Sequence, residues 1–177
     1  MNKKVKNSLL LFISLVVVNV CTQSVYKRID LTADQHFTLS EASKEIISKV
    51  NETLFITVYL DGEFPSEFKR LQLETRQHLE ELAAENTHIK IKFESPDQQV
   101  DALIKRGMIP SKLTVEEAGK FSEAIIFPWA EISYQKKSTI VSLLSTTTLT
   151  SQEEQLQNAI ENLEYRFSNA INLITKT

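Results

Sequence analysis

Cysteine is almost absent from this 177-residue sequence, and glycine and proline are scarce. The single cysteine, Cys21, lies at the end of an apolar run near the N-terminus. The rest of the chain therefore has no disulfide, no thiolate nucleophile and no cysteine-based metal site. The three glycines stand alone at positions 62, 107 and 119, which excludes a glycine-rich phosphate loop. With only four prolines as well, the composition is not that of a low-complexity or disordered chain.

Outside the first 25 residues, basic residues are fewer than acidic ones. The chain has 20 Lys or Arg against 23 Asp or Glu, a net charge of −3, and residues 1–25 hold three of the lysines and no acid. The rest therefore carries −6, and a body of that sign is repelled by the phosphates of nucleic acids and by anionic lipid. We predict no nucleic-acid partner.

Residue patterns typical of catalysis are also missing. Adjacent acidic pairs, as at 80–81, 116–117 and 153–154, point in different directions on a helix and suit a solvated face better than acid–base work. His36, His78 and His88 have no partner at the spacing of metal ligands, and no serine lies in a nucleophile elbow. The sequence predicts no enzyme, no metal and no cofactor.

A basic start followed by an apolar run marks residues 1–25 as a membrane or export segment. Residues 1–7 are basic, and the apolar run Ser8–Val20 has 13 residues. That length is typical of a signal peptide and shorter than the span of about 20 residues that crosses a bilayer. We predict an uncleaved anchor with the following domain in the periplasm. A cleaved signal stays open, as does a lipid on Cys21, although Val18, Asn19 and Val20 lack the small residue that lipoprotein processing prefers.

The body, residues 26–177, alternates helix and strand signals. Capping-box spacing over Thr38–Glu41 predicts a helix to about Val50. A stripe of residues spaced by three or four predicts a helix of about 20 residues that begins near Pro65. Serine caps with acidic or amide partners predict a short helix from Ser95 to Gly107 and a long one from Ser151 onward. The stripe comprises Phe64, Phe68, Leu71, Thr75, Leu79 and Leu82.

Six apolar or alternating stretches predict strands, at 54–60, 88–94, 113–116, 124–127, 130–134 and 139–144. The first two flank a helix, and such a unit crosses over right-handed to give parallel strands, whereas the later short connections favour antiparallel pairs. Pro128, between the stretches 124–127 and 130–134, should bend or break this pair or place it at an edge of the sheet. We predict an α/β fold with a mixed sheet, helices on both faces and a thioredoxin-like arrangement, preceded by an N-terminal transmembrane helix. The turn at 61–65, where a thioredoxin-like motif would lie, has no cysteine, which excludes disulfide exchange.

Two stretches are candidate partner contacts. In the first, the turn Asp61–Pro65 opens a helix whose N–H groups favour an anion, although Asp61 and Glu63 already place negative charge there. The second, Ile125–Trp129, holds the only tryptophan, and core packing competes with a role as an exposed anchor. The candidates are Trp129, Phe127, Pro128, Asp61, Phe64, Lys69 and Arg70.

Several segments, taken in order, resemble the gliding-motility ABC-transporter auxiliary proteins of the GldG family. The first is the stretch 58–65 followed by 68–71, of which residues 59–71 are the most specific part. The others are Arg28–Thr32, Phe37–Ser40, Glu123–Pro128 and Leu163–Tyr165. The resemblance runs from about residue 26 to the end of the chain, which corresponds to the N-terminal portion of that family, since its members are longer and normally end in a second transmembrane helix.

The resemblance implies a bacterial inner-membrane protein with one N-terminal span and its domain in the periplasm. It implies association with the permease and ATPase subunits of an ABC transporter linked to gliding motility or secretion. From it we expect a non-catalytic auxiliary subunit that acts through protein–protein contacts. The alternative is a periplasmic domain that binds a solute or glycan and feeds the transporter, which requires a pocket with converging polar groups.

Overall fold

A mixed four-stranded sheet forms the centre of the computed structural model, which describes residues 39–62, 64, 66–97, 99–117, 120–144 and 151–176. The strands are β1 (Leu54–Val58), β2 (Ile89–Phe93), β5 (Trp129–Tyr134) and β6 (Lys137–Ser142), in the order β2-β1-β5-β6. β1 runs parallel to β2 and antiparallel to β5, and β5 is antiparallel to β6. The prediction of a mixed α/β sheet is thus confirmed.

Residue alternation along β1 separates the two faces of the sheet. Leu54, Ile56 and Val58 are fully buried on one face, which we call the core face, whereas Phe55 on the second face is 55% exposed. The neighbouring strands follow the same alternation, since Ile132 lies opposite Ile56 and Ser133 opposite Phe55. Side chains of successive strand residues point to opposite faces, so β1 contributes three residues to the core.

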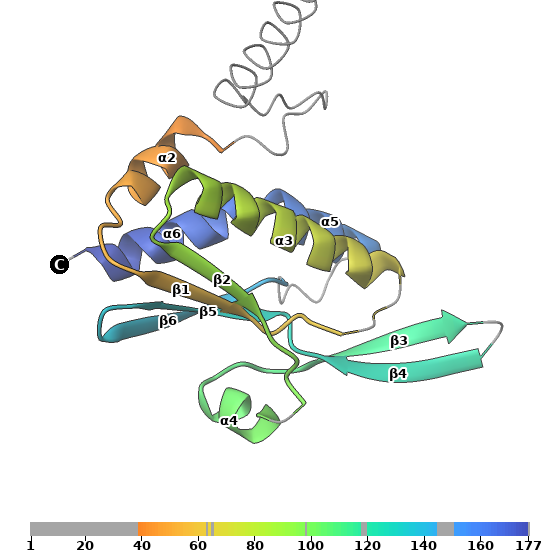
Figure 1. Cartoon of the computed structure of the whole chain (residues 1–177). Helices are drawn as coiled ribbons and strands as arrows, with labels where there is room; N and C mark the ends of the chain where they lie inside the picture. The colour runs from red at the N-terminus through yellow and green to blue at the C-terminus, as the bar shows by residue number, and fades with distance from the viewer. Residues whose placement is uncertain are drawn as a thin grey trace, which may run out of the picture. The chain divides into compact units, whose positions relative to one another are not determined.

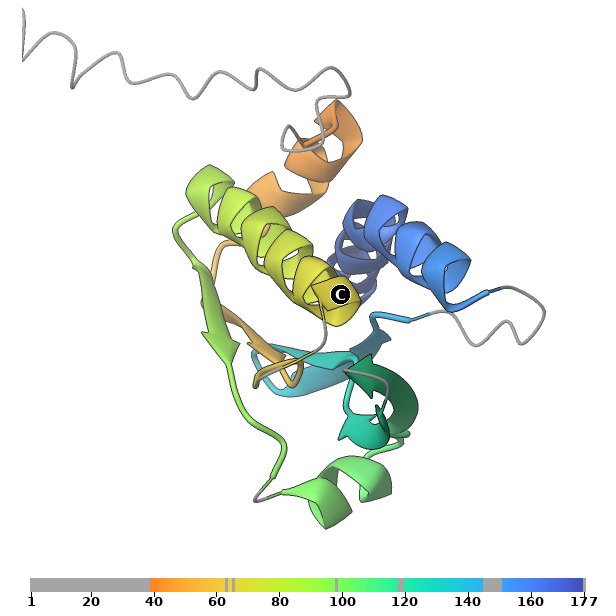
Figure 2. The same cartoon turned by 90° about the vertical axis from the view of Figure 1, so that its right-hand side faces the viewer.

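Four helices cover the core face: α2 (Glu41–Ser48), α3 (Ser66–Glu85), α5 (Gln152–Glu161) and α6 (Leu163–Thr175) (Figures 1 and 2). α3 packs against β2 and α6 against β5 and β6, while α2 and α5 pack on these two helices. The short α4 (Val100–Lys105) lies on the second face at one end of the sheet, where Leu103 joins a small cluster with Tyr59, Met108 and Phe127. Helical cover is therefore unequal, although the sequence predicted helices on both faces.

The apolar stripe of α3 is confirmed. Its members that lie within the helix, Phe68, Leu71, Thr75, Leu79 and Leu82, are all buried. Spacings of three and four place such residues on one side of a helix, here the side toward the sheet. Each buried leucine contributes about 1.5–3 kcal/mol relative to an exposed one, so this stripe is a main source of stability.

Two predicted helix starts were wrong. The N-cap of α2 is Ser40 rather than Thr38, because the Ser40 hydroxyl accepts a hydrogen bond from the Ser43 N–H. α4 begins at Val100 rather than after Ser95, and its N-cap residue Gln99 makes no side-chain capping bond. Its predicted end at Gly107 holds, since that residue has a φ of +90° that suits glycine.

The predicted single C-terminal helix is divided in two at Asn162. Asn162 leaves helical geometry with φ −100° and ψ 4°, and it ends α5 and begins α6. Its side-chain Nδ2 donates to the Asn158 carbonyl oxygen at 2.7 Å, and this oxygen also accepts from the Asn162 backbone N–H at 3.2 Å. Asparagine competes for backbone acceptors in this way and bends or breaks helices.

β3 (Ser111–Glu117) and β4 (Lys120–Ile126) form a separate two-stranded antiparallel sheet instead of joining the main one. Pro128 lies between β4 and β5, where it ends one sheet before the other begins, as its lack of an N–H favours. The described residues belong to one compact unit from Phe37 onward, and the predicted membrane segment 1–25 lies outside them. Among the described helices, none combines the length and apolar character needed to cross a bilayer.

Replacement of Asn86 by alanine should lower the free energy of unfolding by about 1–3 kcal/mol, because three backbone groups each lose a hydrogen bond. The Asn86 side chain donates to the carbonyl oxygens of Ile47 and Val50, both at 2.8 Å, and accepts from the His88 N–H at 2.9 Å. It thereby joins the end of α2 to the start of β2. Urea unfolding measures the effect. The matched control is Asn158→Ala, at an exposed position of α5. Equal stability of the two variants would contradict this role.

Candidate functional site

The Ile125–Trp129 run contributes mainly to the interior. Phe127 is 2% exposed in the small cluster beside α4, and Pro128 is buried as well. Trp129 is half-buried, and its indole N–H donates to the Ile109 carbonyl oxygen at 2.8 Å. Of the three residues predicted as partner contacts in this run, only Trp129 offers surface.

The second predicted group lies where β1 leads into α3. The Gln72 side chain donates to the Leu60 carbonyl oxygen at 3.1 Å and to Asp61 Oδ1 at 3.2 Å, which ties this turn to the helix. Phe64 is half-buried against the main core, whereas Lys69 and Arg70 are exposed. Phe64 and Trp129 pack on different clusters, on opposite faces of the sheet, so the two predicted groups do not form one site.

A hollow of about 420 Å³ lies on the part of the second face that α4 leaves uncovered. Phe55 lines it from the central strand, and polar residues surround it: Glu52, Thr53, His88, Ser133 and Gln135. A phenylalanine that is 55% exposed in the middle of a sheet is unusual, since large apolar residues on central strands are normally covered. This open sheet face is the first candidate site.

Contacts at the other end of the second face fix the limit of the open part. Arg106 Nη1 donates to Glu131 Oε2 at 2.7 Å, and the Tyr59 hydroxyl donates to the same oxygen at 3.2 Å. Burial of the Tyr59 ring, followed by the nearby Glu131 carboxylate, raises the pKa of that hydroxyl. The Arg106–Glu131 ion pair holds the segment after α4 against β5. The segment that contains α4 therefore covers only this end of the second face, and Phe55 stays accessible.

A groove of about 450 Å³ between α2 and α6 is the second candidate site. It is lined by polar residues together with two apolar ones and an exposed aromatic ring: Ser40, Ala42, Ser43, Ile46, Glu161, Glu164, Tyr165, Ser168, Asn169 and Asn172. Tyr165 is 70% exposed. Hydroxyl, amide and carboxylate groups beside an exposed ring suit a neutral polyhydroxylated ligand or the polar part of a protein.

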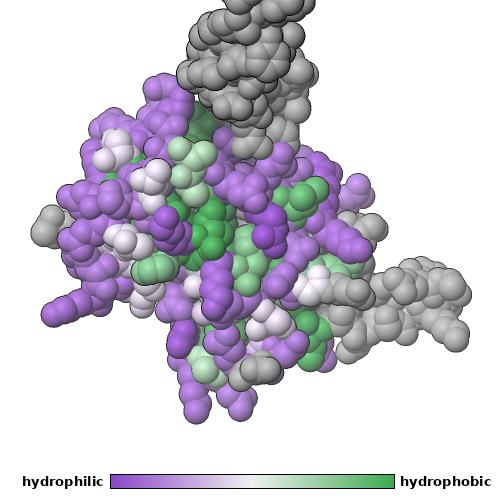
Figure 3. Space-filling model, in the orientation of Figure 1, coloured by the Kyte–Doolittle hydropathy of each residue, from purple (hydrophilic) through white to green (hydrophobic). Residues whose placement is uncertain are grey.

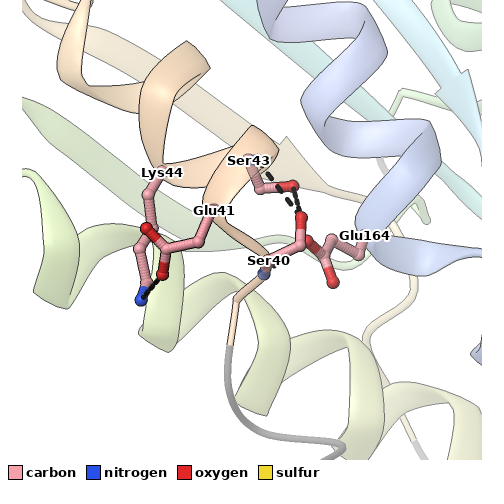
Figure 4. A network of polar contacts seen from close by, with 5 residues as sticks. All are labelled: Ser40, Glu41, Ser43, Lys44 and Glu164. Carbon is pink, nitrogen blue, oxygen red and sulfur yellow. Dashed lines mark hydrogen bonds and ion pairs between the residues drawn. The ribbon is translucent and has the colours of Figure 1, made fainter.

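A hydrogen-bond network forms the floor of this groove (Figure 4). The Ser40 N–H donates to Glu164 Oε1 at 2.9 Å, and the Ser168 hydroxyl donates to the buried Ser43 hydroxyl at 2.8 Å. Burial alone would raise the pKa of the Glu164 carboxyl, but hydrogen bonds from Ser40 and Ser43 outweigh it and the pKa is lowered. Lys44 pairs with Glu41 at 2.8 Å on the exposed side of α2, away from the groove.

Ser43, His78 and Glu164 have the composition of a catalytic triad but not its geometry. Burial lowers the pKa of His78 to about 4, and Glu164 acts on it only through its charge. Within the described part of the chain, the buried His78 Nε2 has no hydrogen-bond partner, and its ring lies 6.1 Å from that of Phe167. A triad needs the serine bonded to the histidine and the histidine to the carboxylate. Here the serine and carboxylate join α2 to α6 instead.

The face seen in Figure 3 is mostly hydrophilic, with hydrophobic residues in several smaller areas. The exposed large hydrophobic residues include Phe55, Leu73, Tyr165 and Leu173. Sequence patterns could have placed Tyr165, because it falls between Leu163 and Phe167, off the buried stripe of its helix. Phe55 gave no such signal, since every residue of 54–60 except Thr57 is apolar or aromatic and alternation is invisible there.

Acidification from pH 7 to pH 4 should lower the free energy of unfolding through His78 by up to about 3 kcal/mol. The pKa of His78 is 6.5 in the unfolded chain, whereas burial lowers this pKa to about 4 in the folded chain. The unfolded state therefore binds more protons in that window, and the free energy of unfolding decreases as the pH is lowered. Glu164, whose folded pKa is lowered, adds its own loss only below about pH 4.5.

Urea unfolding of His78→Leu between pH 7 and pH 4 checks this expectation. In His78→Leu, the slope of the free energy of unfolding against pH should largely disappear above pH 4.5. His88→Leu, at an exposed position, should keep this slope. An unchanged slope in His78→Leu would assign the pH dependence to other groups.

Comparison with known proteins gives a match to a family by sequence and none to a solved structure. The model of a family described as a domain of unknown function, DUF7088, matches residues 33–133. This range includes β1 to β4 and most of β5. No solved structure matches the chain.

A relative from Borreliella burgdorferi is described as an uncharacterized protein. It is 23% identical over 165 residues, which are 88% of this chain and 31% of the relative. The chain thus spans about a third of the length of this relative. The match extends beyond the family model and includes helices that cover the core face.

Proposed function

The chain belongs to the DUF7088 family, and on that premise we propose that it is a non-catalytic, membrane-anchored auxiliary subunit of an ABC transporter linked to gliding motility or secretion. It acts through protein–protein contacts within a complex that contains the permease and ATPase subunits, with its own domain on the periplasmic side of a bacterial inner membrane. The open sheet face around Phe55 carries this proposal, because it is a site for a partner surface rather than for chemistry.

Physical chemistry favours a protein as the occupant of that face. Phe55 offers an apolar centre, and the surrounding Glu52, Thr53, Ser133 and Gln135 offer a polar rim. Protein interfaces have this organisation, with an aromatic anchor enclosed by polar groups. A hollow that holds only one apolar group and opens widely to solvent encloses too little of a small molecule to retain it.

The strand order supports the finer description of the fold as thioredoxin-like and the resemblance to GldG. The order β2-β1-β5-β6, with β1 parallel to β2 and antiparallel to β5, agrees with that arrangement. The most specific part of the GldG resemblance, residues 59–71, follows β1 directly and extends into the start of α3. A turn without cysteine at this place suits a scaffold role.

Substitution of Phe55 by serine should reduce recovery of the transporter permease with this protein from detergent extracts of native membranes by about tenfold, because the central anchor of the contact is lost. The matched control is Tyr165→Ser, which removes an exposed aromatic ring on the opposite side of the sheet. Quantitative mass spectrometry of the purified complex measures both. Equal recovery with Phe55→Ser and the unaltered chain, or purification of the chain with no permease, would refute the proposal.

The groove between α2 and α6 favours a second function, a periplasmic domain that binds a solute or glycan. Tyr165 supplies a ring on which a sugar can stack, and Asn169, Asn172 and Glu161 supply hydrogen-bonding groups beside it. In this case the two substitutions exchange roles. Tyr165→Ser would abolish ligand-induced thermal stabilisation in a glycan screen, and Phe55→Ser would leave it unchanged.

A further inference from the structure

β3 and β4 form an arm that stands apart from the rest of the fold. The two strands pair along their whole length, from Ser111 opposite Ile126 to Glu117 opposite Lys120. They pack against no other helix or strand that the structure describes, and Figure 1 shows them leaving the sheet at one end. The arm is attached at its base, where Ile126 is 1% exposed in the main core.

A free arm of this kind needs a partner. An isolated two-stranded ribbon is at best marginally stable in water, and three or more strands are normally required. Among the described strands, each strand of the arm has only the other as its neighbour. The outer edges therefore present backbone N–H and C=O groups that another strand can pair with.

The outer edge of β3 is complementary to itself. When two copies of β3 run antiparallel and meet at Thr114, Lys112 of one lies opposite Glu116 of the other, twice by symmetry. Leu113 lies opposite Val115 in the same way. Opposite charges and paired apolar residues across neighbouring strands are both favourable.

β4 does not share this property. Antiparallel pairing of two β4 strands about their centre places Glu123 opposite Glu123, and like charges directly opposite are destabilising. The edge of β3 is therefore the one suited to a second copy of the chain.

We propose that β3 pairs with β3 of a second copy, centred on Thr114, to form a four-stranded sheet in the order β4-β3-β3-β4. The contact is two-fold symmetric, as in most homodimers, and it uses backbone pairing for affinity and Lys112–Glu116 for register. Lys112 already has an interaction within its own chain, and its side chain is exposed.

Disulfide trapping tests the register. In a Cys21→Ser background of the full chain in detergent, Thr114→Cys places two thiols directly opposite each other. Paired strands bring such Cα atoms to about 4.5–5.5 Å, within the range that a disulfide spans. Lys112→Cys is the matched control, since the two positions 112 lie about 14 Å apart in this register.

Thr114→Cys should form a covalent dimer under mild oxidation at least about tenfold faster than Lys112→Cys. Absence of the Thr114→Cys dimer, or equal trapping at both positions, overturns the proposal.

Charge exchange provides a second test that needs no cysteine. Glu116→Lys turns both attractive pairs into repulsive ones and should weaken dimerisation by about tenfold, measured by sedimentation velocity of the full chain in detergent. The double variant Lys112→Glu with Glu116→Lys restores opposite charges and should restore the dimer. A dimer that persists in Glu116→Lys, a double variant that stays monomeric, or a monomeric unaltered chain overturns the proposal.

Discussion

The position of β1 between β2 and β5 is the constraint on which the rest of the fold depends. Leu54, Ile56 and Val58 are fully buried, and each lies beside a residue of both neighbouring strands. A parallel neighbour on one side requires a crossover, which α3 supplies, and this crossover brings the α3 stripe onto the core face. α6 then covers β5 and β6, and α2 and α5 close the layer. Of the described helices, only the short α4, which comes after β2 in the chain, lies on the second face.

Much of the fold followed from local patterns because those patterns report burial directly. The α3 stripe and the alternation of β2 each have a single period and a single buried side, so their elements were predicted within a few residues. The break at Asn162 was missed because the apolar spacing continues through it. At that break the Asn162 side chain donates to the Asn158 carbonyl, and the period of the apolar residues carries no information on such a bond. The separation of β3 and β4 into their own sheet was missed because strand signals carry no information on which strands pair.

The candidate sites were less predictable than the fold. Trp129 was singled out because tryptophan is rare in this chain, yet its indole is engaged with the Ile109 carbonyl and its neighbours Phe127 and Pro128 are buried. Phe55 and Tyr165 were not singled out, since exposure depends on which faces the helices leave uncovered. His78 acquires its lowered pKa from packing between helices, and Glu164 approaches it from a helix 86 positions further along the chain. Such encounters are set by tertiary structure alone.

Unequal helical cover gives the even and odd positions of β1 different roles. The even residues 54, 56 and 58 determine whether the protein folds, while the odd positions 55 and 57 belong to the other side of the same strand. Variation at the exposed position 55 leaves the interior volume unchanged, whereas position 57 is half-buried. Related chains can therefore vary the outer surface of this strand at position 55 while the packing of the core face stays the same.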